Sequence, residues 1–203
     1  MFYKFIRGIF RVLSVFLLPT KVIGKETLRR DGSYILACNH QTAMDIPSLM
    51  VACPRVIHFM AKSEFFEKPL LGKLFRKMLV FPVHTATADM QAIRQGINVL
   101  RQGEVLGIFP QGTRRKNKPI LKREEVFGGV ALIALKARTT IIPAMFERSP
   151  LIFRRNVLHI GQPIDLSCYE GQKINQEILD RITDDYTAKM NCLLEGTGAV
   201  NQE

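Results

Sequence analysis

His40 and Asp45 are the residues best suited to proton transfer, and they stand five positions apart directly after an apolar run at 34–38. Histidine is the side chain that most readily takes and returns a proton near neutral pH. A neighbouring carboxylate can select the imidazole tautomer and stabilise the charged form. The pair therefore has the composition of a general base with its orienting acid. The alternative interpretation is a structural turn in which Asp45 caps a helix.

The spacing of this pair limits the backbone that can hold it. In a regular α-helix, residues five apart are separated by about 140° around the axis, so the two side chains would not meet. Pro47 disfavours helical geometry at Ile46 and is best tolerated near a helix start. We therefore expect His40 on the loop that leaves the strand and Asp45 at or near the first turn of a helix.

A second block with chemical potential, PQGTRR at 110–115, follows the apolar run 105–109. Gly112 permits a tight turn. Thr113 and Arg114 supply a hydroxyl and a planar fork of donors, which suits a phosphate. The block is a candidate anion site. Its alternative is a solvated basic loop.

The elements that must position both blocks alternate between strands and helices. Strand-like apolar runs occur at 34–38, 56–61, 79–83, 105–109, 140–146 and 157–160. Helical patterns occupy 89–101, 127–137 and 174–194. This alternation predicts a single-domain α/β sandwich with a mostly parallel sheet flanked by helices. The length of 203 residues is enough for one domain with a sizeable core.

The charge of the chain is unevenly distributed. Residues 165–203 carry eight acids against three bases, so the net charge of +11 leaves about +16 on the remainder. A body this basic is attracted to anionic lipid, nucleic acid or phosphorylated substrates. Basic side chains continue from Arg114 to Arg123, and they either extend an anion site or form a solvated face.

The four cysteines show no CxxC spacing, which indicates free thiols in a reducing compartment. Cys38 stands two residues before His40, so a Cys–His nucleophile is conceivable, although a buried structural cysteine is the favoured alternative. The sequence contains no HExxH or other close ligand cluster, and we expect no metal.

Residues 1–20 form a basic, aromatic and aliphatic segment. Lys4, Arg7 and Arg11 recur at helical spacing and leave the apolar side chains on the rest of the helix. The uncharged stretch 12–20 is shorter than the roughly twenty residues of a spanning helix. A cleaved signal peptide is the rival interpretation, but the segment is not followed by an A-x-A-like cleavage site. We predict an amphipathic helix that lies in the membrane interface. The alternative is a helix packed on the domain.

Taken together, four blocks in order resemble the lysophosphatidic acid acyltransferases, a family of glycerolipid acyltransferases. The blocks are an NHxxxxD motif at Asn39, His40 and Asp45, KSEF at 62–65 followed by FPV at 81–83, FPQGTR at 109–114, and an Ile-Pro strand end at 142–143. Their order and spacing agree with the family from about Val22 to Pro163. The resemblance implies that residues 21–203 form the acyltransferase domain.

The resemblance implies transfer of a fatty acyl group from acyl-CoA or acyl carrier protein, as co-substrate, to the free hydroxyl of 1-acyl-glycerol-3-phosphate. The product is phosphatidic acid for phospholipid biosynthesis, and no other cofactor is implied. His40 would be the base and Asp45 its orienting partner. The implied acceptor-binding residues are Lys62, Gln111, Gly112, Thr113 and Arg114. The implied location is the cytoplasmic face of a membrane, with peripheral or monotopic attachment.

The chain departs from the family pattern at two places. Gln111 replaces a glutamate, which keeps size and hydrogen bonding but removes a charge. His84-Thr85 replaces an Asp-Arg pair and so removes a candidate phosphate ligand. These changes leave open a different lysolipid acceptor or an inactive relative.

A nucleic-acid-binding protein that uses the basic run 114–123 is the alternative from a different class. The chain has no matching fold motif, no Trp, and no aromatic residues within that run. This interpretation also leaves the apolar N-terminus without a role, so we expect no nucleic-acid partner.

Overall fold

The computed structural model describes residues 1–84, 89–195 and 197. Within these residues, seven strands form one sheet in the order β1-β7-β6-β2-β5-β3-β4. The strands are β1 (Thr20–Ile23), β2 (Tyr34–Cys38), β3 (Ile57–Lys62), β4 (Val80–Val83), β5 (Val105–Ile108), β6 (Thr140–Phe146) and β7 (Asn156–Ile160). All neighbours pair parallel except β6 and β7, which pair antiparallel. The predicted α/β fold with a mostly parallel sheet is confirmed.

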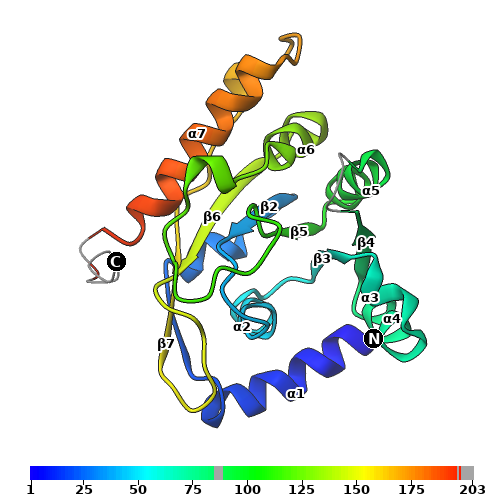
Figure 1. Cartoon of the computed structure of the whole chain (residues 1–203), viewed down its shortest axis with the longest axis vertical. Helices are drawn as coiled ribbons and strands as arrows, with labels where there is room; N and C mark the ends of the chain where they lie inside the picture. Colours follow the sequence, from blue (N-terminus) through cyan, green and yellow to red (C-terminus); the bar gives the residue numbers. More distant parts are fainter. Residues whose placement is uncertain (85–88, 196, 198–203) are drawn as a thin grey trace.

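Helices cover both faces of this sheet (Figure 1). The α-helices are α1 (Phe2–Phe16), α2 (Asp45–Ala52), α3 (Glu64–Glu67), α4 (Pro69–Lys77), α5 (Met90–Arg101), α6 (Gly129–Ala137) and α7 (Gln176–Cys192). Short 3-10 turns occupy η1 (Lys25–Arg29), η2 (Arg123–Glu125) and η3 (Ser167–Tyr169). One apolar core lies between the sheet and α5, α6 and α7, and a second lies between the sheet and α1 and α2.

The predicted runs at 34–38 and 140–146 match β2 and β6 residue for residue, and the other four match their strands within one residue at each end. The sequence analysis did not predict β1, α3 or α4. β1 is a four-residue edge strand whose side chains alternate between half-buried and exposed, so it carries no apolar run. α4 is nine residues long and buries only Gly72, so it forms little of the core.

The helix predicted in residues 1–20 is present as α1, and part of it packs on the domain. Tyr3 is buried, and its hydroxyl accepts a hydrogen bond from the Ile57 amide at 3.1 Å. The Arg7 guanidinium donates to the carbonyls of Cys53, Pro54 and Arg55, where a cation complements the carboxyl end of α2. One of the three basic side chains therefore faces the domain.

The outer side of α1 carries large apolar side chains exposed to solvent. They are Phe5, Ile9, Phe10, Val12, Leu13, Val15 and Phe16. Within the described residues, no helix combines the length and the apolar character that a membrane span requires.

Candidate active site

His40 and Asp45 meet at the end of β2, on the loop that leads into α2. The distance from His40 Nδ1 to Asp45 Oδ2 is 2.6 Å. Asp45 is the first residue of α2, and His40 lies on the loop after β2, as the spacing predicted. The loop 39–44 bends the chain so that two side chains that could not meet on a helix form a hydrogen bond.

The Asp45 carboxylate is held by backbone donors as well as by the imidazole. The amides of Gln41 and Thr42 donate to its Oδ2 at 2.7 and 2.9 Å, and the Thr42 hydroxyl donates to Oδ1 at 3.3 Å. Asp45 is 0% exposed. An ionised carboxylate only accepts hydrogen bonds, so His40 Nδ1 carries the proton and Nε2 keeps a free lone pair. The geometry selects the imidazole tautomer that a general base needs.

The end of β5 builds the wall beside the imidazole. The Phe109 ring stacks on His40 with centroids 3.9 Å apart and an interplanar angle of 18°. The amide of His40 donates to Gln111 Oε1 at 3.3 Å, and its carbonyl accepts from the Arg115 amide at 2.7 Å. Because β2 and β5 are paired neighbours, the PQGTRR turn is fastened directly to the backbone of His40.

Two buried amides on either side of His40 fix the same loop to the end of β6. Asn39 exchanges hydrogen bonds with the Phe146 backbone at 2.8 and 3.0 Å, and Gln41 Nε2 donates to the Phe146 carbonyl at 2.9 Å. The Ser149 hydroxyl donates to Gln41 Oε1 at 3.2 Å. Neither supporting role was predicted for Asn39 or Gln41. Polar amides that flank a histidine directly after a buried strand are the signal that indicates such a role.

The glycine turn presents its two donors to solvent. Gly112 adopts a φ of +62°, and a Cβ there would lie 3.0 Å from the Phe127 ring. Thr113 and Arg114 are exposed, and neither side chain bonds to any residue that the structure describes. Arg115, in contrast, pairs with Glu125 at 3.3 Å. Of the two adjacent arginines, only Arg114 is left with a free guanidinium for an anion.

The Gln111 side chain is buried and bonds to the backbone of His40 instead of facing solvent. It is 3% exposed, and its Oε1 accepts from the His40 amide. Its Nε2 is buried and has no partner among the described residues. The amide therefore anchors the turn to His40 and retains one unused donor.

Lys62 lies apart from the other predicted site residues. It is the last residue of β3, half-buried, and bonds to no side chain in the described part of the chain. It shares the carboxyl edge of the sheet with His40 and the glycine turn, since β3, β5 and β2 run parallel. At the end of β4, His84 Nδ1 lies 2.9 Å from the Ser63 hydroxyl. Thr85, where the family pattern has an arginine, lies outside the described residues.

Cys38 is a structural residue. It is fully buried in β2, and burial raises the pKa of its thiol well above the usual range. A thiol held protonated in this way is a poor nucleophile, which excludes the Cys–His alternative. The four cysteines are free thiols.

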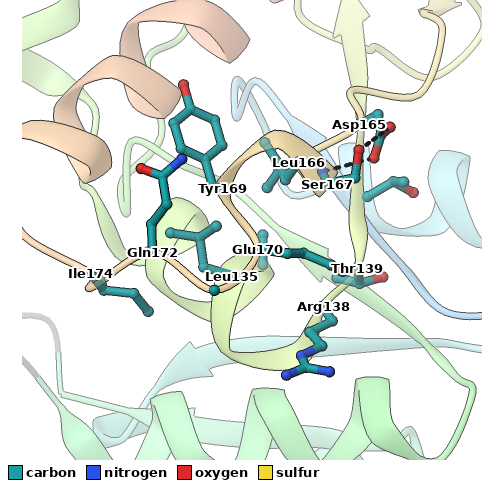
Figure 2. A pocket seen from close by; sticks show the side chains of 13 residues that line it. Leu135, Arg138, Thr139, Asp165, Leu166, Ser167, Tyr169, Glu170, Gln172 and Ile174 are labelled. Carbon is teal, nitrogen blue, oxygen red and sulfur yellow. Dashed lines mark hydrogen bonds between the residues drawn. The ribbon is translucent and has the colours of Figure 1, made fainter.

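A cavity of about 300 Å³ lies elsewhere in the domain, between the carboxyl end of α6 and the 165–174 segment (Figure 2). Thr139 and Thr140 line it at the start of β6. β6 is parallel to β2, so this cavity is at the opposite edge of the sheet from His40. It contains none of the predicted site residues. In the described ranges, no group of three or more His, Cys, Asp or Glu side chains could hold a metal ion.

The fold and the site define an α/β enzyme with a hydrogen-bonded His–Asp pair next to a turn that carries an exposed arginine, at the carboxyl edge of a mostly parallel sheet. Residues 19–147 match the family model described as Acyltransferase. The chain belongs to this acyltransferase family, as the resemblance of its motifs predicted. Membership sets aside the nucleic-acid-binding alternative.

Two bacterial relatives and one solved structure illustrate the similarity. The chain is 34% identical over 168 residues to the 1-acyl-sn-glycerol-3-phosphate acyltransferase of Bacillus subtilis, covering 80% of this chain and 82% of the relative. It is 31% identical over 211 residues to the enzyme of the same name from Streptococcus pneumoniae, covering 97% and 75%. The crystal structure of the 1-acyl-sn-glycerophosphate acyltransferase PlsC from Thermotoga maritima shares the fold, with a TM-score of 0.66 at 20% identity over 96% and 82% of the two chains.

Proposed function

We propose that this acyltransferase moves a fatty acyl group from a thioester to the free hydroxyl of 1-acyl-glycerol-3-phosphate and so makes phosphatidic acid. The donor is acyl-CoA or acyl carrier protein. The observation that carries the proposal is the 2.6 Å contact from His40 Nδ1 to Asp45 Oδ2, which leaves Nε2 available as a base, while the turn that carries Arg114 is held on the His40 backbone. The relatives that share the family carry the corresponding name.

The chemistry follows from the protonation state of the pair. His40 Nε2 takes the proton of the acceptor hydroxyl as its oxygen attacks the thioester carbonyl. The C–O bond forms, the tetrahedral intermediate collapses, and the C–S bond breaks. The proton on Nε2 then passes to the departing thiolate, so the enzyme returns to its starting state without a covalent intermediate.

Asp45 acts through His40. When the imidazole becomes an imidazolium, the carboxylate 2.6 Å from Nδ1 stabilises the new charge. The two backbone amides that hold Asp45 keep the carboxylate in place through the cycle. This preorganisation means that no side chain must reorganise at the moment of transfer.

The acceptor phosphate is the group that the glycine turn is suited to hold. Arg114 offers a fork of donors and Thr113 offers a hydroxyl, with Gln111 orienting the turn and Lys62 contributing charge from the same sheet edge. Gln111 and Thr85, where the family pattern has Glu and Arg, favour a different lysolipid acceptor as the second candidate. Purified protein, given both acyl donors and a panel of lysolipids with products identified by mass, distinguishes the two.

Arg114→Ala should raise the KM for the lysophospholipid by about 10- to 100-fold, the worth of a charge-assisted bidentate contact, and leave the donor KM nearly unchanged. Arg114→Lys should rescue only part of the loss because the fork is gone. Steady-state kinetics with each substrate varied in turn measure the effect, and Lys118→Ala in the same basic run is the control. A rise in the donor KM would instead assign the turn to the donor phosphates or to the carrier protein.

Attachment to a membrane is proposed from the outer side of α1. The exposed apolar side chains of this helix stand next to Lys4 and Arg11, which suits an interface rich in anionic lipid. Deleting the segment 1–18 is not a clean test, because Tyr3 and Leu18 are buried in the domain core. The deletion would expose part of the core and so combine a loss of membrane binding with a loss of stability.

Substitution on the outer side of α1 separates membrane binding from folding. Val12→Gln/Phe16→Gln should lower partition into anionic vesicles by about 10- to 100-fold, because two large apolar groups no longer enter the interface. Cosedimentation with vesicles measures the partition, and circular dichroism checks the fold. Met90→Gln, at an exposed methionine on α5, is the control. Unchanged cosedimentation of the double variant would place the attachment elsewhere.

A further inference from the structure

The loop between β6 and β7 exposes three large apolar side chains in a row. Leu151, Ile152 and Phe153 are 43%, 51% and 78% exposed. Figure 1 shows this loop in yellow, below β7 and next to the carboxyl end of α1. Exposed single apolar residues are ordinary, but a contiguous apolar tip marks an interaction surface.

Hydrogen bonds hold the backbone of this loop at its base and at its tip, and so keep the three apolar side chains exposed. The buried Asn156 side chain accepts from the Leu151 amide at 3.1 Å and donates to the Leu151 carbonyl at 3.3 Å. The Phe153 amide donates to the Leu17 carbonyl at 2.7 Å. The last contact places the tip of the loop against the end of α1, where Phe16 is also exposed.

Phe153 occupies a conformation that an aromatic residue rarely adopts. Its φ is +60°, in the left-handed region that favours glycine and asparagine. A backbone that would be relaxed by Gly or Asn instead carries the most exposed aromatic ring of the chain. Strain of this kind is associated with a functional constraint on the side chain.

The charges next to the tip narrow the choice of partner. Arg154 and Arg155 follow Phe153 directly and are exposed. Neither forms an ion pair within the described part of the chain. Exposed apolar side chains directly followed by two unpaired arginines suit a bilayer surface, where acyl chains lie beneath anionic headgroups.

We propose that the 151–155 loop is a second membrane-insertion element, which enters an anionic lipid surface beside α1. This inference rests on the proposed function, because the acceptor is a membrane lipid. The Thr42 hydroxyl oxygen lies 3.2 Å from the Pro150 carbonyl oxygen at the root of the loop, and the Thr42 amide donates to Asp45. Insertion of the tip therefore brings the His40–Asp45 site to the lipid surface from which the acceptor comes.

The chain contains no Trp, so a single introduced indole reports on one position. In full-length Phe153→Trp, addition of mixed phosphatidylglycerol–phosphatidylcholine vesicles should shift the emission to the blue, and lipids brominated on the acyl chain should quench it. Met90→Trp on α5 is the matched control and should show neither change. If the Phe153→Trp protein sediments with the vesicles while its emission stays unchanged, the loop does not insert and the proposal is overturned.

Polar substitutions test the energetic contribution. Ile152→Asn/Phe153→Asn should lower partition into the same vesicles by about 10- to 100-fold. Because Asn tolerates the left-handed conformation, the thermal midpoint should stay the same or rise. Arg154→Gln/Arg155→Gln should lower partition into anionic vesicles by about 10- to 30-fold and leave partition into pure phosphatidylcholine unchanged.

Three outcomes would overturn the loop assignment. The Ile152→Asn/Phe153→Asn variant could partition into vesicles as well as the wild-type chain does. The wild-type chain could self-associate without lipid and lose this association in the Asn variant, or the Asn variant could show a raised donor KM with unchanged partition. The last two would assign the tip to a second copy of the chain or to a carrier protein. Acyl transfer to a monomeric short-chain lysolipid is measured in parallel and should be unaffected by the Asn variant. If the wild-type chain shows no transfer while the Phe153→Trp indole inserts, the proposed reaction fails and the loop inference stands.

Discussion

Replacing His40 by alanine should lower kcat for acyl transfer by about 10²- to 10⁴-fold, the usual worth of a positioned general base. The structure leaves no substitute, because Asp45 is buried and saturated by His40, two amides and a hydroxyl. The KM values should change little, since the proposed mechanism places His40 on the reacting hydroxyl and not on the acceptor phosphate. Rapid-quench or steady-state assays with purified protein measure the effect.

His159 provides a matched control for this substitution. Its Nε2 lies 2.6 Å from Glu147 Oε1 and its side chain is 12% exposed, close to the 11% of His40. His159→Ala therefore removes a similarly buried histidine–carboxylate contact on β7, which β6 separates from β2, and kcat should remain near the wild-type value. A His40→Ala enzyme with a normal thermal midpoint and near-normal turnover would rule out His40 as the base.

Asp45→Asn should lower kcat by a similar factor, about 10²- to 10⁴-fold. The asparagine keeps one oxygen that can accept from the amides of Gln41 and Thr42, so the loop should retain its shape. The lost charge no longer stabilises the imidazolium that forms on His40. Turnover and the thermal midpoint are measured together.

The control for Asp45→Asn is Glu147→Gln, which makes the same change from carboxylate to amide at the other histidine pair. It should leave kcat near the wild-type value. If Asp45→Asn and Glu147→Gln lower turnover equally, the effect is a general loss of stability. If His40→Ala is inactive while Asp45→Asn is fully active, His40 works without an orienting carboxylate.

The local sequence pattern was sufficient to predict the strands that are buried on both faces. It was also sufficient to predict the contact between His40 and Asp45, which are close in the chain. β2 and β6 follow from apolar runs because a strand covered on both faces has no polar positions. The contact of His40 with Asp45 follows from five residues of chain and from Pro47 near the start of α2. Both are decided within a few residues, where steric limits on the backbone act directly.

The sequence pattern could not predict the edge of the sheet or the reversed strand. β1 is short and half-exposed, and β7 pairs parallel with β1 but antiparallel with β6. Strand direction and neighbour order depend on how the connections pack over the sheet. Propensity measured along the chain does not contain that information.

The sequence alone therefore determined the fold class and the contact of His40 with Asp45, because the strand and helix patterns and this pair are each encoded by residues close together in the chain. Only the tertiary structure decided what surrounds them. Pairing of β2 with β5 placed Gln111, 71 residues away, on the His40 amide, and pairing with β6 brought Asn39 to Phe146 across 107 residues. The apolar patterns of the strands do not specify which strands become neighbours. The packing of the whole core decides which of them pair.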